Sequence, residues 1–89
     1  MLRITRKKNG EVMFKVSGDL NAENIEEIRA LIAAEREPDC IVFDLKDLTS
    51  VDAEAVRFLE KCEAAEIRFR ECSAYIRGRI TRERLNRTA

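Results

Sequence analysis

The 89-residue sequence contains no histidine and no tryptophan, a single proline, and three glycines that stand alone at positions 10, 18 and 78. Without histidine, the Ser or Cys relays used by many nucleophilic enzymes lack their usual base. The isolated glycines form no Gly-rich phosphate-binding loop. Carboxylates are numerous, but their spacing matches no known metal-binding loop. The sequence therefore predicts no catalytic residues, no cofactor and no metal site.

The cysteines and the hydropathy of the chain bear on its compartment. Cys40, Cys62 and Cys72 are odd in number and form no CxxC motif, so neither a disulfide framework nor a zinc site fits them, and buried reduced thiols are expected. No apolar run approaches the roughly 20 residues of a membrane span, and Met1 leads directly into a strand-like stretch without a signal peptide. We therefore expect a cytoplasmic protein without membrane association.

The start of the chain has the pattern of a β-hairpin followed by a helix. Residues 2–7 and 12–17 alternate in character, and Asn9-Gly10 between them supplies a hairpin turn. Asn21 is expected to cap a helix with isoleucine and leucine at helical spacing, and this helix should end before Pro38.

The remainder of the chain alternates strands and helices. Residues 40–43 form a continuous apolar run, typical of a central strand covered on both faces. Asp52 and Ser73 are expected to cap the second and third helices, with a more exposed strand at residues 67–70 between them. The order ββαβαβα predicts an α/β fold with a small mixed, largely parallel four-stranded sheet and three helices, in a single domain over residues 1–89.

The C-terminal segment is basic although the formal net charge of the chain is zero. The apolar positions of its expected helix are Tyr75, Ile76, Ile80 and Leu85. Its arginines are Arg77, Arg79, Arg82, Arg84 and Arg87. Because these arginines spread around most of the helix, a solvated basic face is favoured over contact with nucleic acid, which would need a cluster.

The segment LTSVDAEAVRFL, residues 48–59, places two carboxylates at the start of the second helix. Asp52 stands at the N-cap, where its carboxylate can accept a hydrogen bond from the backbone N–H of residue 54 or 55, a contribution of about 1 kcal/mol. Glu54 lies in the first turn, where the helix dipole favours a negative charge. These structural roles suffice to explain both acids, and from the residues alone we favour them over a functional role.

Three stretches resemble the STAS domain, the module of bacterial anti-sigma factor antagonists. The string IVFDL at residues 41–45, followed by LTSVD at residues 48–52 and a helix, is similar to the family's buried strand, short loop and Asp-Ser-Ser-Gly helix start. The string VSGDL at residues 16–20 resembles the family's glycine-containing exit from its second strand. The resemblance covers about residues 2–72, after which the chain is shorter than the family and lacks its final strand and helix.

The family's Asp-Ser-Ser-Gly falls on residues 52–55, so that Glu54 occupies the position of the phosphorylated serine. A carboxylate forms no stable phosphoserine switch, but it places a negative charge at a helix N-terminus. Either Glu54 holds the module in a state like the phosphorylated one, or the switch has been abandoned. Glu carries about one charge against roughly 1.5 to 2 for phosphate, so imitation would be partial. The hydroxyls of Thr49 and Ser50 are expected to bond to local backbone rather than to be modified.

The resemblance implies a non-catalytic protein-interaction module in bacterial signalling or transcription regulation, without the phosphoacceptor serine. Its partner would be a protein such as a kinase-type anti-sigma factor, and a homodimer that replaces the missing C-terminal end stays open. The implied partner-binding residues are Thr49, Ser50, Asp52, Ala53, Glu54 and Arg57. The alternative is a small-ligand domain for a nucleotide or another anion, which Glu54 would oppose by repulsion.

Overall fold

The computed structural model describes residues 1–35 and 40–88 and confirms an α/β fold with three helices and a mixed sheet. The elements are β1 (Leu2–Asn9), β2 (Glu11–Leu20), α1 (Ala22–Ala33), β3 (Ile41–Asp44), β4 (Leu48–Val51), α2 (Ala53–Ala64), β5 (Arg68–Arg70) and α3 (Ala74–Thr88). The sheet has five strands rather than four, because residues 48–51, expected as a loop, pair with the end of β2. α1 ends at Ala33, as expected, while Pro38 lies outside the described residues.

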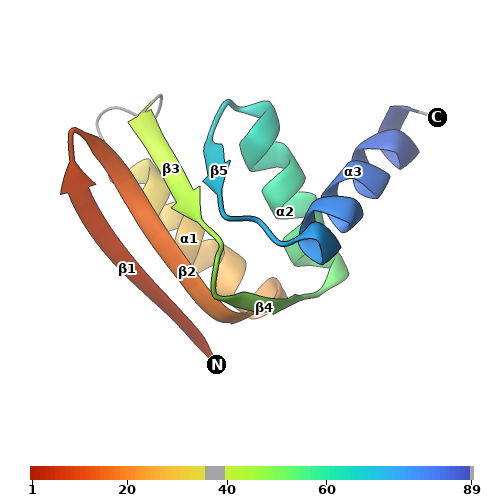
Figure 1. Cartoon of the computed structure of the whole chain (residues 1–89), viewed down its shortest axis with the longest axis horizontal. Coiled ribbons are helices and arrows are strands. Elements are labelled where there is room, and N and C mark those ends of the chain that lie inside the picture. Colours follow the sequence, from red (N-terminus) through yellow and green to blue (C-terminus); the bar gives the residue numbers. More distant parts are fainter. Residues whose placement is uncertain (36–39, 89) are drawn as a thin grey trace.

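β2 is the strand on which the sheet is assembled (Figure 1). One edge of β2 pairs antiparallel with β1. Its other edge pairs in parallel with β3 along residues 12–15 and with β4 along residues 18–20. β5 extends the sheet in parallel beyond β3. The predicted hairpin is confirmed, and Gly10, which separates β1 from β2, has a φ of +82° as a tight turn requires.

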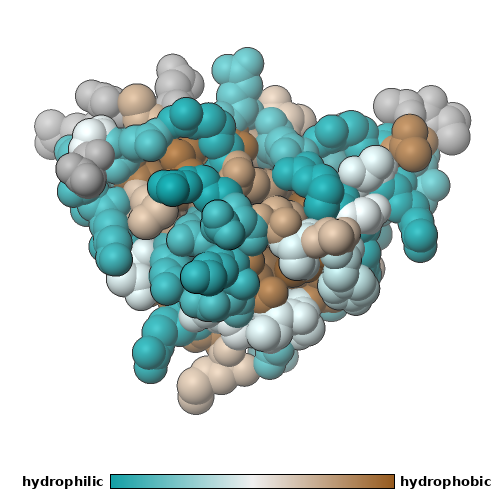
Figure 2. Space-filling model, in the orientation of Figure 1, coloured by the Kyte–Doolittle hydropathy of each residue, from teal (hydrophilic) through white to brown (hydrophobic). Residues whose placement is uncertain are grey.

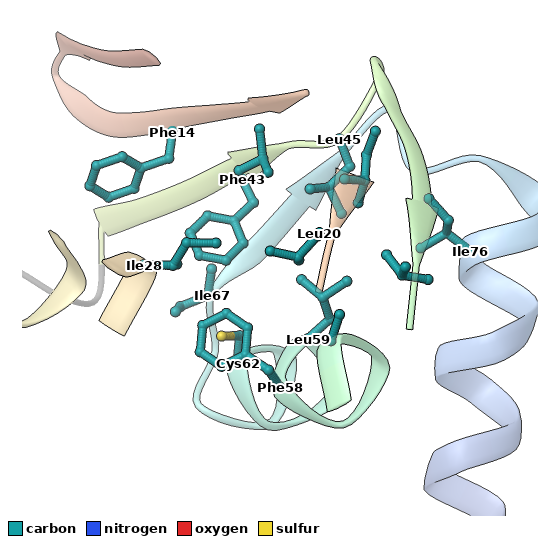
Figure 3. Close-up of a cluster of buried hydrophobic side chains, with 14 of the residues drawn as sticks. Phe14, Leu20, Ile28, Phe43, Leu45, Phe58, Leu59, Cys62, Ile67 and Ile76 are labelled. Atoms are coloured by element: carbon teal, nitrogen blue, oxygen red, sulfur yellow. The ribbon is translucent and has the colours of Figure 1, made fainter. Parts of the chain in front are cut away.

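The core lies between one face of the sheet and the helices α1 and α2, and Figure 3 shows side chains of both layers meeting there. Phe43 of β3 is central, because its ring packs edge-on against Phe14 at 6.2 Å between centroids and stacks on Phe69 at 5.9 Å. Alternate residues of β2 are buried from Val12 to Val16, as the sequence pattern predicted. β3 is buried along residues 41–43, but helices cover only one of its two faces, where the sequence predicted both.

α3 packs on α2 through a narrow strip of its surface. Ile76 and Ile80 are fully buried, whereas Tyr75 and Leu85, assigned to the same apolar set by the sequence pattern, are 61% and 64% exposed. The pattern was wrong for these two residues because α3 contacts α2 along one side only and extends away from the sheet (Figure 1). No helix within the described residues is long and apolar enough to cross a membrane.

The arginines of α3 mostly contact the protein itself. Arg77 and Arg84 both form ion pairs with Glu63 of α2, and the Arg77 guanidinium lies 5.7 Å from the centre of the Phe69 ring. Arg79 donates a hydrogen bond to the backbone oxygen of Val51. These contacts attach α3 to the body of the domain and engage three of the four arginines of α3 whose side chains are described.

The three cysteines differ in burial. Cys62 of α2 is buried in the core, and this burial raises the pKa of its thiol to about 12. Cys40 and Cys72 are only partly buried, so the expectation of three buried thiols is wrong for two of them. Both of these cysteines lie next to short strands near the edge of the core rather than within a helix that faces it.

The last strand, β5, is bounded by two residues in the left-handed region of backbone conformation. Glu66 precedes it with a φ of +70°, and Glu71 follows it with a φ of +57°. Both turns are made by non-glycine residues, for which this conformation is unfavourable. β5 is consequently limited to three residues.

Gly18 of β2 pairs with Leu2 at the start of β1. It has a φ of +93°, and a Cβ placed on it would lie 2.0 Å from the backbone oxygen of Met1. We therefore expect Gly18→Ala to lower the free energy of unfolding by at least about 2 kcal/mol, because left-handed strain alone costs about 1 to 2 kcal/mol. Urea unfolding followed by circular dichroism measures this.

Gly78→Ala is the matched control for that substitution. Gly78 lies inside α3, its φ is not positive, and a Cβ there would have nothing within 4 Å. The same change at this site should raise the stability by about 0.5 to 1 kcal/mol through helix propensity. If Gly18→Ala were as stable as the wild type, the close approach of the two strands would not constrain the fold.

Candidate functional site

The six residues implied as a binding surface lie together where β4 leads into α2. Thr49 and Ser50 belong to β4, Asp52 is the N-cap, and Ala53 begins α2. All six side chains are exposed, including those of Glu54 and Arg57 on the first turns of the helix. The structure therefore places the expected residues on one continuous surface, which we call the α2 entrance (Thr49, Ser50, Asp52, Ala53, Glu54 and Arg57).

Asp52 holds the start of two helices at once. Its Oδ1 accepts a hydrogen bond from the backbone N–H of Ala55 at 2.8 Å, which confirms the predicted N-cap of α2. Its Oδ2 accepts another from the N–H of Ala22, the first residue of α1, at 3.0 Å. These bonds, that of Ala55 foremost, lower the pKa of the Asp52 carboxyl below its ordinary value of 3.8. The second of the two bonds was not expected from the sequence.

Asp19, at the end of β2, is a residue of this region that sequence reasoning left out of the site. Its Oδ1 accepts hydrogen bonds from Ser50 Oγ at 2.7 Å and Thr49 Oγ1 at 3.3 Å, and its Oδ2 lies 3.0 Å from the amine of Met1. The Ser50 bond is the main cause that lowers the pKa of Asp19. The available signal was the stretch VSGDL, in which Asp19 follows the glycine of a strand exit.

The hydroxyls of β4 bond across the sheet to β2. Thr49 Oγ1 donates to the backbone oxygen of Gly18 at 2.9 Å in addition to its contact with Asp19. The expected bond to nearby backbone is thus replaced by bonds to residues about 30 positions earlier in the chain. Both hydroxyls serve to fasten β4 to β2.

Glu54 forms an ion pair with Arg57, one turn further along α2. Both side chains are about half exposed, at 56% and 46%, so solvent screens the pair. The hydrogen bond that Arg57 donates to the Glu54 carboxylate raises the pKa of Arg57. The charge of Glu54 is therefore partly balanced by a cation on the same helix.

A groove runs between α1 and α2 beside the α2 entrance. It has a volume of about 220 Å³ and is lined by Ala22, Ile25, Glu26, Arg29, Glu54, Arg57, Phe58 and Lys61. The Arg29 guanidinium lies 5.8 Å from the centre of the Phe58 ring on its floor. Arg29 and Lys61 come from exposed helix positions without any motif, so the sequence offered no signal for their place in the groove.

The geometry of the α2 entrance bears on which ligands it could hold. Within residues 1–35 and 40–88, no three carboxylates or thiols gather closely enough to hold a metal ion. The backbone N–H groups of Ala22 and Ala55, which an anion at either helix start would use, already bond to Asp52. The geometry thus disfavours the alternative of a nucleotide or anion site at the start of α2.

Comparison with known proteins identifies a protein family and a similar solved structure. A sequence model of the STAS domain family matches residues 3–70, which extend from β1 to β5. A comparison with curated proteins finds no match. The crystal structure of an uncharacterised DUF3478-family protein from Shewanella loihica PV-4, described as having a SpoIIAA-like fold, is similar with a TM-score of 0.52 and 19% sequence identity. The similarity covers 74% of this chain and 61% of that one, less than two thirds of its length.

Asp52→Ala should remove the N-cap of α2 and, in addition, the hydrogen bond from the first N–H of α1, whose own N-cap is Asn21. Because an N-cap and a single hydrogen bond each contribute about 1 kcal/mol, we expect the free energy of unfolding to fall by about 2 kcal/mol, measured by urea denaturation. Glu54→Ala, two residues away and in the same helix turn, should change it by less than about 0.5 kcal/mol. Equal losses in the two variants would show that Asp52 is no more than a charged first-turn residue.

The lowered pKa of Asp52 also gives a pH dependence. Since the folded pKa lies below the unfolded one, the contribution of the carboxylate is complete above the unfolded value of about 4 and is lost as the pH falls toward the folded value. Asp52→Asn, which has no titratable group, should therefore lose less stability than the wild type between pH 7 and pH 3. Identical losses in the two proteins would contradict this.

Proposed function

Because the chain belongs to the STAS domain family, we propose that it is a non-catalytic protein-interaction module that resembles an anti-sigma factor antagonist. We place this module in bacterial signalling or transcription regulation, with a protein such as a kinase-type anti-sigma factor as its partner. The α2 entrance is the proposed binding surface. The single observation that carries the proposal is the exposure of Glu54 in the first turn of α2, a helix that Asp52 caps. By resemblance to the family, Glu54 stands at the position of the phosphorylated serine.

The backbone beneath this surface is fixed before any partner arrives. Asp52 joins the starts of α1 and α2, and Asp19 holds the hydroxyls of β4. The exposed side chains of Ala53, Glu54 and Arg57 stand on this fixed support. Preorganised surfaces lose less conformational entropy on binding, which supports a docking role for this region.

Of the two states that Glu54 could represent, an abandoned switch is the better supported. A phosphoserine would bring a charge of about −1.5 to −2 and three acceptor oxygens, whereas a carboxylate brings about −1. Arg57 already balances part of that smaller charge. The proposed contact is therefore permanently available and is not controlled by phosphorylation at position 54.

We also propose that residues 1–89 act as one domain in the cytoplasm. Ile76 and Ile80 of α3 belong to the same core cluster as the strands and the other helices, which supports a single unit that includes the segment beyond the family match. The odd number of cysteines without a disulfide between described residues supports a reducing compartment.

Glu54→Arg should weaken the partner contact without unfolding the protein. The charge reversal breaks the pair with Arg57 and places a cation at the centre of the α2 entrance. In a quantitative pull-down from the source organism's lysate, we expect recovery of a kinase-type regulator to fall at least about tenfold. Circular dichroism checks the fold.

Glu27→Arg is the matched control for that pull-down. Glu27 is an exposed glutamate of α1 without an ion pair in the described structure, and it does not line the groove between α1 and α2. This variant should recover the regulator as the wild type does. Equal recovery by both variants and the wild type would place the partner surface elsewhere.

The wild-type protein should accept no phosphate. After incubation with a lysate of the source organism and ATP, intact-mass analysis should show no added phosphate, because Glu54 has no hydroxyl and those of Thr49 and Ser50 are bound to β2. Glu54→Ser provides the positive control, since it restores a hydroxyl at that position. One stable phosphate on Thr49 or Ser50 of the wild type would contradict the proposal of an unregulated contact.

A further inference from the structure

One face of the sheet is covered by no helix of the described residues. In Figure 1, α1 and α2 lie behind the sheet, and α3 lies to the side, where it packs on α2. The uncovered face consists of the odd-numbered residues within 3–7 and 11–17 and of residues 42, 44, 68 and 70, which strand pairing places side by side. We call this surface the open sheet face. It is distinct from the α2 entrance.

The centre of the open sheet face is apolar. Met13 and Val42 are paired across β2 and β3, and neither belongs to the core cluster. Val42 is only 3% exposed, although no described helix covers it. A hollow of about 290 Å³ beside it is lined by Glu11, Val42, Arg68, Phe69 and Arg70.

Cations surround this apolar centre. The five cations of the open sheet face are Arg3, Lys7, Lys15, Arg68 and Arg70. Its two carboxylates are Glu11 and Asp44; Glu11 forms an ion pair with Arg68, and Lys15 forms one with Asp47 of the following turn. In the described structure, Arg3, Lys7 and Arg70 form no ion pair and are exposed. Figure 2 shows hydrophilic side chains across this face with hydrophobic surface between them.

Strand pairing arranges charged and apolar side chains in rows across the open sheet face. One row across the sheet consists of Lys7, Met13, Val42 and Arg68. Neighbouring strands are about 4.8 Å apart, so the two end cations stand about 14 Å apart with the apolar pair between them. An extended peptide places alternate residues on one side and advances about 14 Å over four residues. A segment with an acid, an apolar residue and an acid at alternate positions matches this row.

We propose that the open sheet face binds an acidic segment of a partner protein, with an apolar side chain over Met13 and Val42 and carboxylates on the cations at either side. Charge complementarity identifies the occupant, since the face has surplus positive charge and the three cations without ion pairs are exposed. Nucleic acid is the less suitable occupant, because the strand residues of this face are not aromatic, and Phe69, which lines the hollow, has its ring stacked on Phe43 of the core.

The test uses a fluorescein-labelled peptide that contains two copies of Glu-Ser-Leu-Ser-Glu, with binding followed by fluorescence anisotropy at low ionic strength. The double variant Lys7→Glu/Arg70→Glu should bind at least about tenfold more weakly than the wild type, because two attractive charges become repulsive. The matched control is Lys8→Glu/Arg82→Glu, which reverses one exposed lysine on the other face of β1 and one exposed arginine of α3. The control should change the affinity by less than about threefold.

Four outcomes would overturn the proposal. The peptide could fail to bind the wild type at all. Both double variants could lose the same affinity, which would indicate attraction by charge without a site. A single-stranded oligonucleotide of equal charge could bind the same face more tightly than the peptide, which would make it a nucleic-acid surface. Sedimentation could show a dimer of the wild type that Lys7→Glu/Arg70→Glu abolishes, which would make a second copy the occupant.

Discussion

The carboxylate of Asp52 ties together three parts of the chain that meet at one end of the sheet. Its two oxygens accept the N–H groups of Ala22 and Ala55, and its own N–H donates to the backbone oxygen of Leu20 at 3.3 Å. The end of β2, the start of α1 and the start of α2 are therefore positioned relative to one residue. The aspartate is therefore needed for the fold, independently of any role that the α2 entrance has in binding.

Local patterns predicted most of the fold. The caps at Asn21, Asp52 and Ser73 are confirmed, since a cap joins atoms only two or three residues apart and leaves a local signature. The alternation along β2 is confirmed for the same reason. The strand β4 was not predicted, because its four residues show no alternation of polar and apolar side chains. They form a strand only through pairing with the end of β2, which is distant in the sequence.

The candidate site was predictable as a segment but not as an arrangement. The resemblance marked residues 48–57, but the bonds from Asp52 to Ala22 and from Asp19 to Ser50 join residues 30 and 31 positions apart. The open sheet face could not be predicted from the sequence for a similar reason. Its cations come from three separate strands, and the net charge of zero gives no sign that they gather on one face. Charge balance over a whole chain says little about how charge is distributed over its faces.

The two left-handed glutamates around β5 affect what the edge of the sheet can do. An edge strand presents unpaired backbone groups on which another chain can add a strand, and a longer, flatter edge is a better template for fibre growth. Glu66 and Glu71 turn the backbone away at both ends of β5, so only three residues are offered, and both glutamates add negative charge beside them. We therefore expect this side of the molecule to be a poor template for strand addition.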